Sequence, residues 1–263
     1  MSNLTALIDS DTPIFATALV SEDVDLSIAK SRLDYNINKI IEGSGADKYK
    51  LFVSGEGNFR KEIDPSYKLH RVDNPTPKWR EDLRLHLIEA WGAIECNGYE
   101  ADDACGIHQC SDGSTIICGI DKDLLQIPGR HYQWPITRKG EIVRPALYHD
   151  IDEEIGWRNL FTQALTGDVA DNIKGVYGIG DVRAAKILAE CSTEEEFYNL
   201  IADQKAIKDE DVKEKYLPVR RAEVESKRKS NMKSNSEYNG FAIIKLLGHV
   251  KPPTKPRNRG SGS

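Results

Sequence analysis

The chain has 263 residues, of which 39% are hydrophobic and 30% are charged, with a formal net charge of −6. This length suits one large domain, or one domain with a smaller one, and the hydrophobic share is enough for a real core. The sequence has no apolar run of about 18 residues, which argues against a transmembrane helix. Its first residues lack the basic and apolar segments of a signal peptide, so we expect a cytoplasmic protein with no membrane partner.

The charge is unevenly distributed along the chain. Residues 205–259 hold 15 Lys and Arg against 7 Asp and Glu, a local balance of +8 that leaves −14 for the rest. A basic end on an acidic body suits a surface that binds a polyanion beside a metal-binding carboxylate cluster. A solvated helix followed by a basic tail has the same composition. The five cysteines include no Cys-x-x-Cys pair, so we expect free thiols.

The N-terminal stretch predicts a strand followed by a helix. Residues 4–8 form a short apolar run, typical of a buried parallel strand, and a helix is expected to begin near Pro13. Asp9 and Asp11 lie between the two. Because ligands collect at the carboxyl ends of strands in open α/β sheets, Asp9 is a candidate metal ligand. Asp11 is either a second ligand or a helix cap.

The next segment combines regular elements with a basic stretch. Helical periodicity covers residues 24–42 and 80–93, and residues 48–53 predict a second strand. Residues 59–84 are rich in Lys and Arg, with aromatic rings in between. Cations suit phosphates and rings suit bases, so this stretch is a candidate nucleic-acid contact. The alternative is an exposed loop and helix, with Trp79 packed into the core.

Three carboxylates then fall within four residues, at Glu100, Asp102 and Asp103. Glu100 and Asp103 are three residues apart and would share one face of a helical turn. Like charges this close repel each other, and a hard divalent cation such as Mg²⁺ or Mn²⁺ neutralises them through oxygen ligands. The alternative is the solvated first turn of a helix, where the helix dipole stabilises acidic residues.

Carboxylates recur in pairs after two later elements. Residues 114–118 predict a strand and residues 155–165 a helix, with short strands or a β-hairpin expected over 131–148. The two pairs that follow the strand and the helix are Asp121 with Asp123, and Asp168 with Asp171.

A glycine-rich turn over residues 175–180 opens a further helix at Asp181. Glycine lets the backbone approach a phosphate, and a helix N-terminus supplies free N–H groups. The alternative is a helix–turn–helix that serves only its own packing.

Four segments together resemble the structure-specific 5′ nucleases: flap endonucleases, the 5′-nuclease domain of bacterial DNA polymerase I, and bacteriophage 5′→3′ exonucleases. The segments are residues 8–11 (IDSD), 100–103 (EADD), 119–124 (GIDKDL) and 167–180 (GDVADNIKGVYGIG). Residues 67–71 also match the family's Tyr-Lys-x-x-Arg segment. The resemblance covers about residues 4–190, and the short length together with the run over 59–68 looks most like the bacteriophage exonucleases.

The resemblance implies a PIN-like α/β domain with a central, mainly parallel sheet over residues 1–155. It implies a helix–three-turn–helix DNA-binding region over residues 156–250. Residues 251–263 are expected to be a basic tail, and the last four, Gly-Ser-Gly-Ser, have the composition of an artificial linker.

The resemblance also implies two Mg²⁺ ions, with Mn²⁺ as a substitute, held by carboxylates. Those implied for the first ion are Asp9, Glu100 and Asp102, and those around the second are Asp103, Asp121, Asp123, Asp168 and Asp171. Lys68 would contact the scissile phosphate, with Arg71 assisting. Many members have an Asp at the tip of the second strand, where this chain has Gly55 and Glu56. Either Glu56 substitutes for it, or water takes that place.

DNA contacts are implied at Arg60, Lys61, Tyr67, Gly175, Gly178, Gly180 and Arg183, and a backbone K⁺ site at Val176 and Ile179. The implied activity is hydrolysis of DNA at 5′ ends and 5′ flaps, including RNA–DNA primer junctions, during replication or repair. It would be carried out by a monomer, in the host cytoplasm if the protein is phage-encoded. Two alternatives remain: a PIN-domain ribonuclease, and a DNA-binding module without catalysis.

Overall fold

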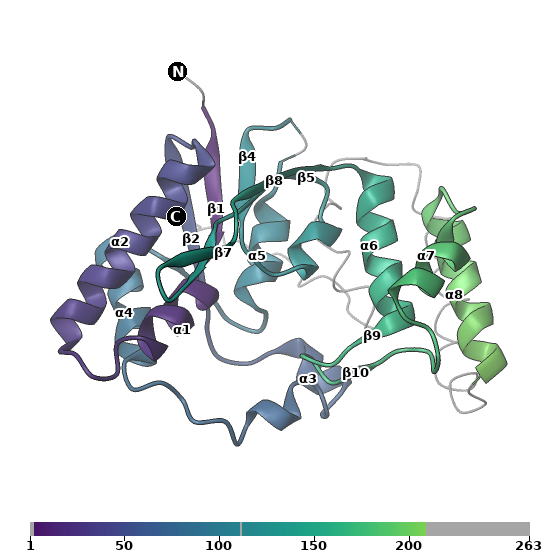
Figure 1. Ribbon diagram of the computed structural model, residues 1–263, viewed down its shortest axis with the longest axis horizontal. Coiled ribbons are helices and arrows are strands. Elements are labelled where there is room, and N and C mark those ends of the chain that lie inside the picture. The colour runs from purple at the N-terminus through teal and green to yellow at the C-terminus, as the bar shows by residue number, and fades with distance from the viewer. Residues whose placement is uncertain (1–2, 111, 209–263) are drawn as a thin grey trace, which may run out of the picture.

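The computed structural model describes residues 3–110 and 112–208 (Figure 1). The basic tail expected over residues 251–263 lies outside the described residues. So do the DNA-binding region expected after residue 208 and nearly all of the basic end over 205–259.

A six-stranded sheet forms the centre of the larger part of the molecule, in the order β3-β2-β1-β4-β5-β8. Neighbouring strands are parallel except for β8, which runs antiparallel to β5. The prediction of a central, mainly parallel sheet is confirmed. The bounds are β1 Thr5–Asp9, β2 Lys48–Ser54, β3 Ile94–Cys96, β4 Thr115–Cys118, β5 Gly129–Gln133 and β8 Leu147–Ile151.

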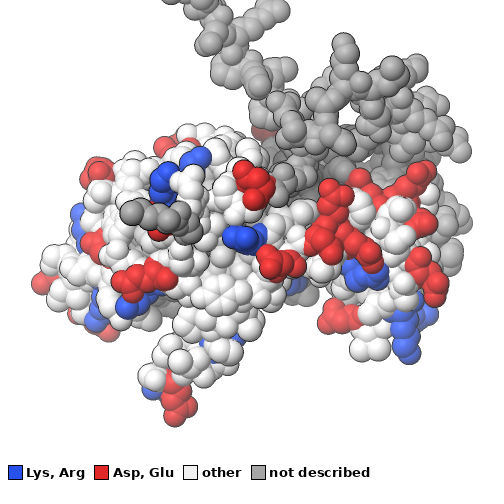
Figure 2. All heavy atoms as spheres, turned by 90° about the horizontal axis from the view of Figure 1, so that it is seen from above, with Lys and Arg blue, Asp and Glu red and all other residues white. Residues whose placement is uncertain are grey.

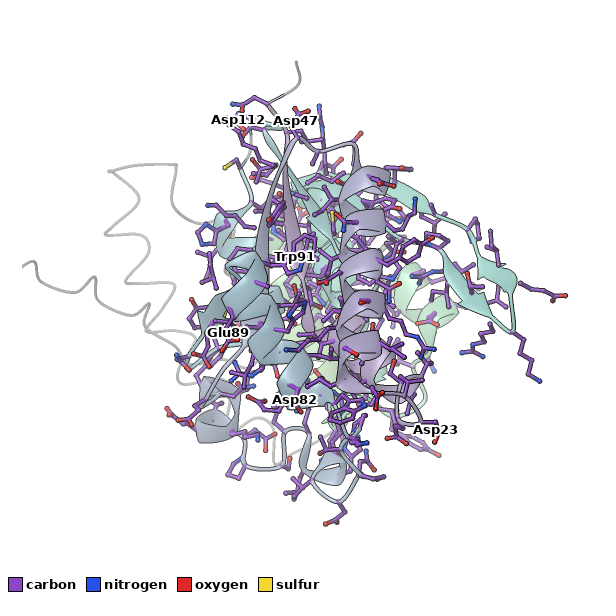
Figure 3. The ribbon with its side chains drawn as sticks, turned by 90° about the vertical axis from the view of Figure 1, so that its left-hand side faces the viewer. Asp23, Asp47, Asp82, Glu89, Trp91 and Asp112 are labelled. Carbon is purple, nitrogen blue, oxygen red and sulfur yellow. The ribbon has the colours of Figure 1, made fainter. Side chains whose placement is uncertain are left out.

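Helices cover both faces of the sheet, because successive residues of the buried β1 point to opposite sides. Ile8 lies in one core, with the helices α1 (Asp11–Leu19), α2 (Leu26–Ser44) and α4 (Arg80–Trp91). Its neighbour Leu7 lies in a second core, under α5 (Ala101–His108). Figure 3 shows α2 and α4 side by side, with Trp91 between them. The Trp91 indole donates to Asp34 Oδ1 over 2.7 Å, which ties the two helices together.

A helical unit with its own core follows, on the right of Figure 1. Phe161 and Phe197 stack within that core, with ring centroids 5.5 Å apart. The elements are α6 Glu153–Thr166, β9 Gly167–Asp168, β10 Ile173–Lys174, α7 Asp181–Leu188 and α8 Glu194–Lys208. The division between residues 155 and 156 stays a prediction, and α6 itself begins before it.

Short elements connect these parts. They are α3 Phe59–Ile63, the 3-10 helices η1 Leu69–Arg71 and η2 Asp123–Gln126, and the hairpin strands β6 Ile136–Arg138 and β7 Glu141–Arg144. The strands predicted within 131–148 are therefore present. None of the helices in the described part of the chain has the length and apolar composition that a membrane span requires.

Candidate functional site

Asp9 ends β1, and β1 lies between β2 and β4 in the sheet. The chain turns to opposite sides of β1 to form these two neighbours, and ligand sites of open α/β sheets occur at such switch points. The Asp9 side chain is 6% exposed, and its Oδ1 accepts a bond from the backbone N–H of Asp11 over 3.2 Å. Burial, Asp11 and then Asp121 and Glu100 raise the pKa of Asp9 to about 7. A nearby cation would therefore stabilise the ionised form of Asp9.

Asp11 binds protein backbone, not the end of its own helix. Its Oδ1 accepts from the backbone N–H of Ser54 over 3.0 Å, which joins the start of α1 to the end of β2. Ser10 takes the N-cap position of α1. Glu56, just after β2, is exposed, and its backbone N–H donates to Asn97.

Glu100 is the N-cap of α5, and it forms a reciprocal capping box with Asp103. The backbone N–H of Glu100 donates to Asp103 Oδ2 over 3.0 Å, and the Glu100 side chain accepts from the Asp103 N–H. The spacing that predicts a shared face thus has a helix-capping cause. The acidic first turn and the candidate site coincide.

Three side chains donate to the Glu100 carboxylate, in addition to the Asp103 N–H. Lys68 Nζ lies 2.9 and 3.0 Å from its two oxygens, Tyr67 Oη donates over 3.0 Å and Asn58 Nδ2 over 2.9 Å. Burial alone would raise the pKa of Glu100, but the charges of Lys68 and Arg60 lower it. Glu100 is therefore ionised and already neutralised.

Asp102 is the opposite case. Its Oδ1 accepts one bond from the Asp103 N–H over 2.7 Å. Burial, followed by the charges of Asp103 and Glu100, raises the pKa of Asp102 well above its usual range, and Asp9 contributes in the same direction. Within the residues that the structure describes, no ion pair involves Asp9 or Asp102.

The second group of carboxylates gathers where η2 meets the end of α6. Asp121 Oδ1 accepts from the Asp123 N–H over 3.0 Å, and Asp123 accepts from the amide of Gln163 on α6. Burial and then Asp121 raise the pKa of Asp123 to about 6. Asp168 and Asp171 lie close enough to Asp123 to raise its pKa further.

Asp168 and Asp171 are paired with cations. Lys122 Nζ lies 3.0 Å from Asp168 Oδ2, and although burial opposes it, this contact lowers the pKa of Asp168. Asp171 Oδ1 lies 3.1 Å from Arg71 Nη2 and 3.6 Å from Lys68 Nζ. Lys68 therefore lies between the two groups, since it also binds Glu100 over 2.9 Å.

Asp103, expected near the second ion, is held by protein. The two guanidinium nitrogens of Arg60 donate to its two oxygens over 2.6 and 2.7 Å, and Arg60 and Asp103 are 2% and 1% exposed. Arg60 is thus buried inside the protein, although the sequence analysis assigns it to the DNA surface. The DNA contact expected at Tyr67 is corrected for the same reason. Tyr67 is 3% exposed, and its hydroxyl donates to Glu100 and Asp171 inside the protein.

Other expected contacts lie at the surface. Lys61 is exposed on α3, and Arg183 is exposed on α7 and donates to the Gly178 carbonyl over 3.4 Å. Trp79 packs against the core and donates to the Val24 carbonyl over 3.1 Å, as expected if this segment is an exposed loop and helix with Trp79 turned inward.

The glycines of the 175–180 turn differ in what surrounds them. A Cβ on Gly175 would lie 2.2 Å from a backbone atom of Thr166, so only glycine fits there. Gly178 has a φ of 75°, which favours glycine, and nothing lies within 4 Å of a Cβ placed on Gly180. Val176 and Ile179 bury their side chains in the helical core, which leaves their backbone for the proposed K⁺.

No group of three or more His, Cys, Asp or Glu side chains among the described residues is arranged as a ready-made ion site. Lys68, Lys122 and Arg71 hold several of the oxygens that such a site would need. The chemistry of the donors nevertheless fits a hard divalent ion, because all are carboxylate oxygens and, in the described part of the chain, neither Asp9 nor Asp102 forms an ion pair. Those two, with Glu100, are the residues best placed to hold it.

Three residues that contact the carboxylates are not predicted from the sequence. Lys122 had a signal, because it stands between two predicted carboxylates. Asn58 and Gln163 had none, since each reaches its carboxylate across about 40 residues of chain.

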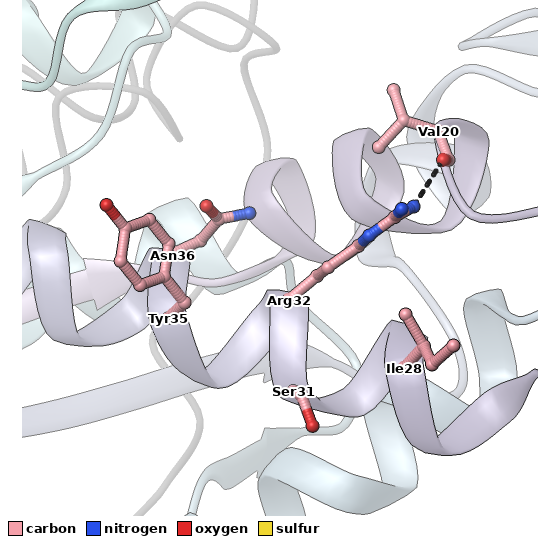
Figure 4. Close-up of a pocket in the computed structure, with 6 residues that line it drawn as sticks. All are labelled: Val20, Ile28, Ser31, Arg32, Tyr35 and Asn36. Carbon is pink, nitrogen blue, oxygen red and sulfur yellow. Dashed lines mark hydrogen bonds between the residues drawn. The ribbon is translucent and has the colours of Figure 1, made fainter. Parts of the chain in front are cut away.

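The structure also has an open groove of about 360 Å³ between α1 and α2, away from the carboxylates (Figure 4). Its lining is mainly apolar, and its one cation, Arg32, donates to the Val20 carbonyl over 2.8 Å. It has no part in the candidate site. The lining residues are Val20, Ile28, Ser31, Arg32, Tyr35 and Asn36.

Solved structures with this fold define its class. The bacteriophage T5 D15 protein with metal ions gives a TM-score of 0.52 at 17% identity, over 76% of this chain and 85% of that one. The T5 D15 flap endonuclease with DNA and metal ions gives 0.51 at 17%, over 77% and 85%. The catalytic core of Rad2 with DNA substrate gives 0.51 at 13%, over 93% and 78%. The chain thus has the PIN-like fold of the structure-specific 5′ nucleases, as its motifs predict.

In sequence, the chain is similar to part of bacterial DNA polymerase I. It is 34% identical over 194 residues to the enzyme of Bacillus caldotenax, which is 68% of this chain and 21% of that protein. It is 30% identical over 234 residues to that of Geobacillus stearothermophilus, which is 81% and 26%. The chain therefore spans about a fifth to a quarter of these relatives. No protein-family model matches it.

Proposed function

We propose that the chain is a metal-dependent 5′→3′ exodeoxyribonuclease and 5′-flap endonuclease that hydrolyses DNA phosphodiester bonds in replication or repair. The observation that carries this proposal is the pair of Asp9, which is buried, and Asp102, which is half-buried. Burial raises the pKa of both, Asp11, Asp121 and Glu100 raise that of Asp9 further, and Asp103, Glu100 and Asp9 raise that of Asp102. The charge of Arg60 offsets the rise at Asp102 only in part. Such a pair at a strand-end switch point suits a cation-binding catalytic site.

Metal ions are the proposed cofactor, as two Mg²⁺ with Mn²⁺ as a substitute. Two bound ions would activate a water molecule and stabilise the leaving oxygen of the phosphodiester. Asp9, Glu100 and Asp102 would hold one ion, and Asp121, Asp123, Asp168 and Asp171 would surround the other. The T5 D15 flap endonuclease was crystallised with DNA and metal ions, which supports this assignment.

Lys68 is proposed to contact the reacting phosphate. Its ammonium lies between Glu100 and Asp171, and so between the two carboxylate groups. A fixed positive charge there stabilises the negative charge that develops on the phosphate oxygens. Arg71, 3.1 Å from Asp171 and 44% exposed, can assist from the solvent side.

The duplex is proposed to bind at the end of the helical unit where α6 stops. Gly178, Gly180 and Arg183 lie there, with the N-terminus of α7, and Lys61 adds an exposed cation on α3. A backbone K⁺ site at Val176 and Ile179 belongs to the same surface. Figure 2, seen from above, shows acidic side chains gathered over the helical unit. The first turns of α6 and α8 are acidic, which disfavours that end for DNA.

The test is cleavage of 5′-labelled flap duplexes with Mg²⁺, with Mn²⁺ and with EDTA, on DNA and on an RNA flap of the same sequence. We expect metal-dependent products from the 5′ end of the DNA, with an RNA–DNA primer junction also cleaved. Stronger cleavage of the RNA flap would favour a PIN-domain ribonuclease. Tight DNA binding without cleavage under any metal would favour a module without catalysis. Size-exclusion chromatography tests the proposed monomer.

A further inference from the structure

We propose that Asp103 is not a metal ligand but, with Arg60, a buried positioning pair that orients Glu100 and the Tyr67–Lys68 segment for the reaction. This inference rests on the proposed function, and it departs from the ligand role that the family resemblance implies for Asp103.

Every oxygen of Asp103 is in use. Oδ1 accepts from Arg60 Nη2 over 2.7 Å, and Oδ2 accepts from Arg60 Nη1 over 2.6 Å and from the Glu100 N–H over 3.0 Å. A bidentate guanidinium–carboxylate pair is among the most strongly directional contacts in proteins. A metal ion would have to displace Arg60, which is 2% exposed.

Arg60 is fixed from its other side by aromatic rings. Its Cζ lies 4.7 Å from the ring centroid of Phe59 and 5.9 Å from that of Tyr67. It cannot be exchanged for solvent without loss of this packing, whereas Lys68 has a side chain that is 22% exposed. Two kinds of cation therefore lie beside the carboxylates. Arg60 is buried and permanently paired, whereas Lys68 is partly exposed and can change its partner.

The pair reaches Glu100 by two paths. Through Asp103 it holds the Glu100 backbone, and so the start of α5. Through α3 it holds Asn58, whose Oδ1 accepts from the Arg60 N–H over 2.9 Å while its Nδ2 donates to Glu100 over 2.9 Å. Arg60 Nη1 also lies 3.8 Å from Glu100 Oε2. The guanidinium of Arg60 thus reaches the Glu100 main chain through Asp103. The backbone N–H of Arg60 positions the Asn58 amide that donates to the Glu100 side chain.

The test measures Mn²⁺ binding to the full chain without DNA, by the loss of the free-ion paramagnetic resonance signal, together with the melting temperature. The variants are Asp103→Asn, Arg60→Gln, the double variant Arg60→Gln/Asp103→Asn, and Asp102→Asn as the ligand-loss control. The double variant keeps an amide pair and a cap acceptor at position 103 but removes both buried charges.

We expect each single variant of the pair to melt earlier and to bind Mn²⁺ about 10-fold more weakly, the scale of a lost support for a ligand. The double variant should return to within about 3-fold of wild-type Mn²⁺ affinity, while Asp102→Asn should stay at least about 10-fold weaker. If a single variant does not fold, the comparison of the double variant with wild type and Asp102→Asn still decides.

A double variant as weak as Asp102→Asn would make Asp103 a ligand and overturn the inference. A wild-type chain that binds no Mn²⁺ would overturn the proposed function, and the positioning role with it. A wild-type chain that binds Mn²⁺ and cleaves flaps, with a double variant that does not recover, would leave the function intact and remove the inference alone.

Discussion

The carboxylates of the site are of two kinds. Asp9 of β1 is buried and Asp102 of α5 is half-buried, neither forms an ion pair among the described residues, and both have raised pKa values. Glu100 is half-buried and Asp168 is buried, but Lys68 and Lys122 hold their pKa values low. Position in the sheet does not explain the difference, since Glu100 and Asp102 are two residues apart.

The difference lies in whether a lysine side chain forms an ion pair with the carboxylate. Asp9 and Asp102 lie on or beside rigid elements, and their raised pKa values reflect a repulsion that an added cation or a proton would relieve. Glu100 and Asp168 are paired with lysines, whose flexible side chains can rotate to contact a phosphate instead. Four changes would break or sharpen this comparison.

The largest effect is expected from Asp121→Asn. Asp121 is exposed, so the fold should not change, but its charge should be essential for the second ion. We expect turnover on a flap duplex to fall by at least about 100-fold, with DNA affinity within a few-fold of wild type. Glu56→Gln changes another exposed carboxylate, just after β2, and normal turnover of this variant would show that Glu56 does not replace the missing Asp. Activity of Asp121→Asn near wild type at saturating Mg²⁺ would remove Asp121 from the site.

Lys68→Ala should come next. A charge at the reacting phosphate acts on the transition state, so single-turnover rates should fall about 100-fold while Kd changes little. Lys61→Ala, an exposed cation on the neighbouring α3, should do the reverse: weaker binding and a shallower salt dependence, at a normal rate. If Lys68→Ala raises only Kd, Lys68 is an ordinary backbone contact.

The third change concerns pH and stability without metal. Asp9 has a folded-state pKa of about 7 against 3.8, so it favours the folded state fully below about pH 4 and loses this contribution as pH rises through 7. Without metal, this group should make the protein about 2 kcal/mol less stable at pH 8 than at pH 5. Asp9→Asn should remove that difference, as urea titrations of both proteins at the two pH values would reveal.

His131 titrates in the opposite sense. Burial lowers its pKa to about 4, so the stability it contributes above pH 6.5 is lost as pH falls towards 4. The wild-type profile also includes Asp102 and Asp123, whose pKa values are raised like that of Asp9. The difference between wild type and Asp9→Asn therefore reports Asp9 together with its effect on Asp102. An unchanged difference across pH 5 to 8 would contradict the raised pKa.

The smallest effect is expected from Gly180→Val. Because nothing lies within 4 Å of a Cβ at Gly180, the melting temperature should not change. Duplex affinity should fall about 10-fold if backbone groups of this turn approach DNA or a bridging cation. Gly175→Ala is the contrasting variant, since its Cβ would clash with Thr166 and should lower the melting temperature instead. Normal duplex binding by a folded Gly180→Val protein would refute the gripping role.

Much of the fold could be predicted because its signals are local. The apolar run over residues 4–8 became β1, with Asp9 at its end, and the 114–118 run became β4. The i, i+3 spacing of Glu100 and Asp103 marked the start of α5. Period and position suffice for such features, since neighbours in sequence determine them.

The burial of Arg60 and Tyr67 could not be predicted in this way. A basic segment with aromatic rings has the composition of a nucleic-acid surface, and only contacts across 43 and 104 residues turn these side chains inward. Lys122 illustrates the same limit, because its bond to Asp168 depends on how α6 packs against η2. Which charges neutralise which is decided by tertiary structure.

The contact of Lys68 with Glu100, over 2.9 Å, has a thermodynamic consequence. An ion that takes the Glu100 oxygens must release the ammonium, and a substrate phosphate that attracts the ammonium must release the oxygens. Each ligand therefore lowers the cost of binding the other, and by reciprocity the two affinities rise by the same factor. If the proposed function holds, a protein with only one of the two ligands would bind it more weakly, so the state with metal and DNA bound together would be favoured over either alone.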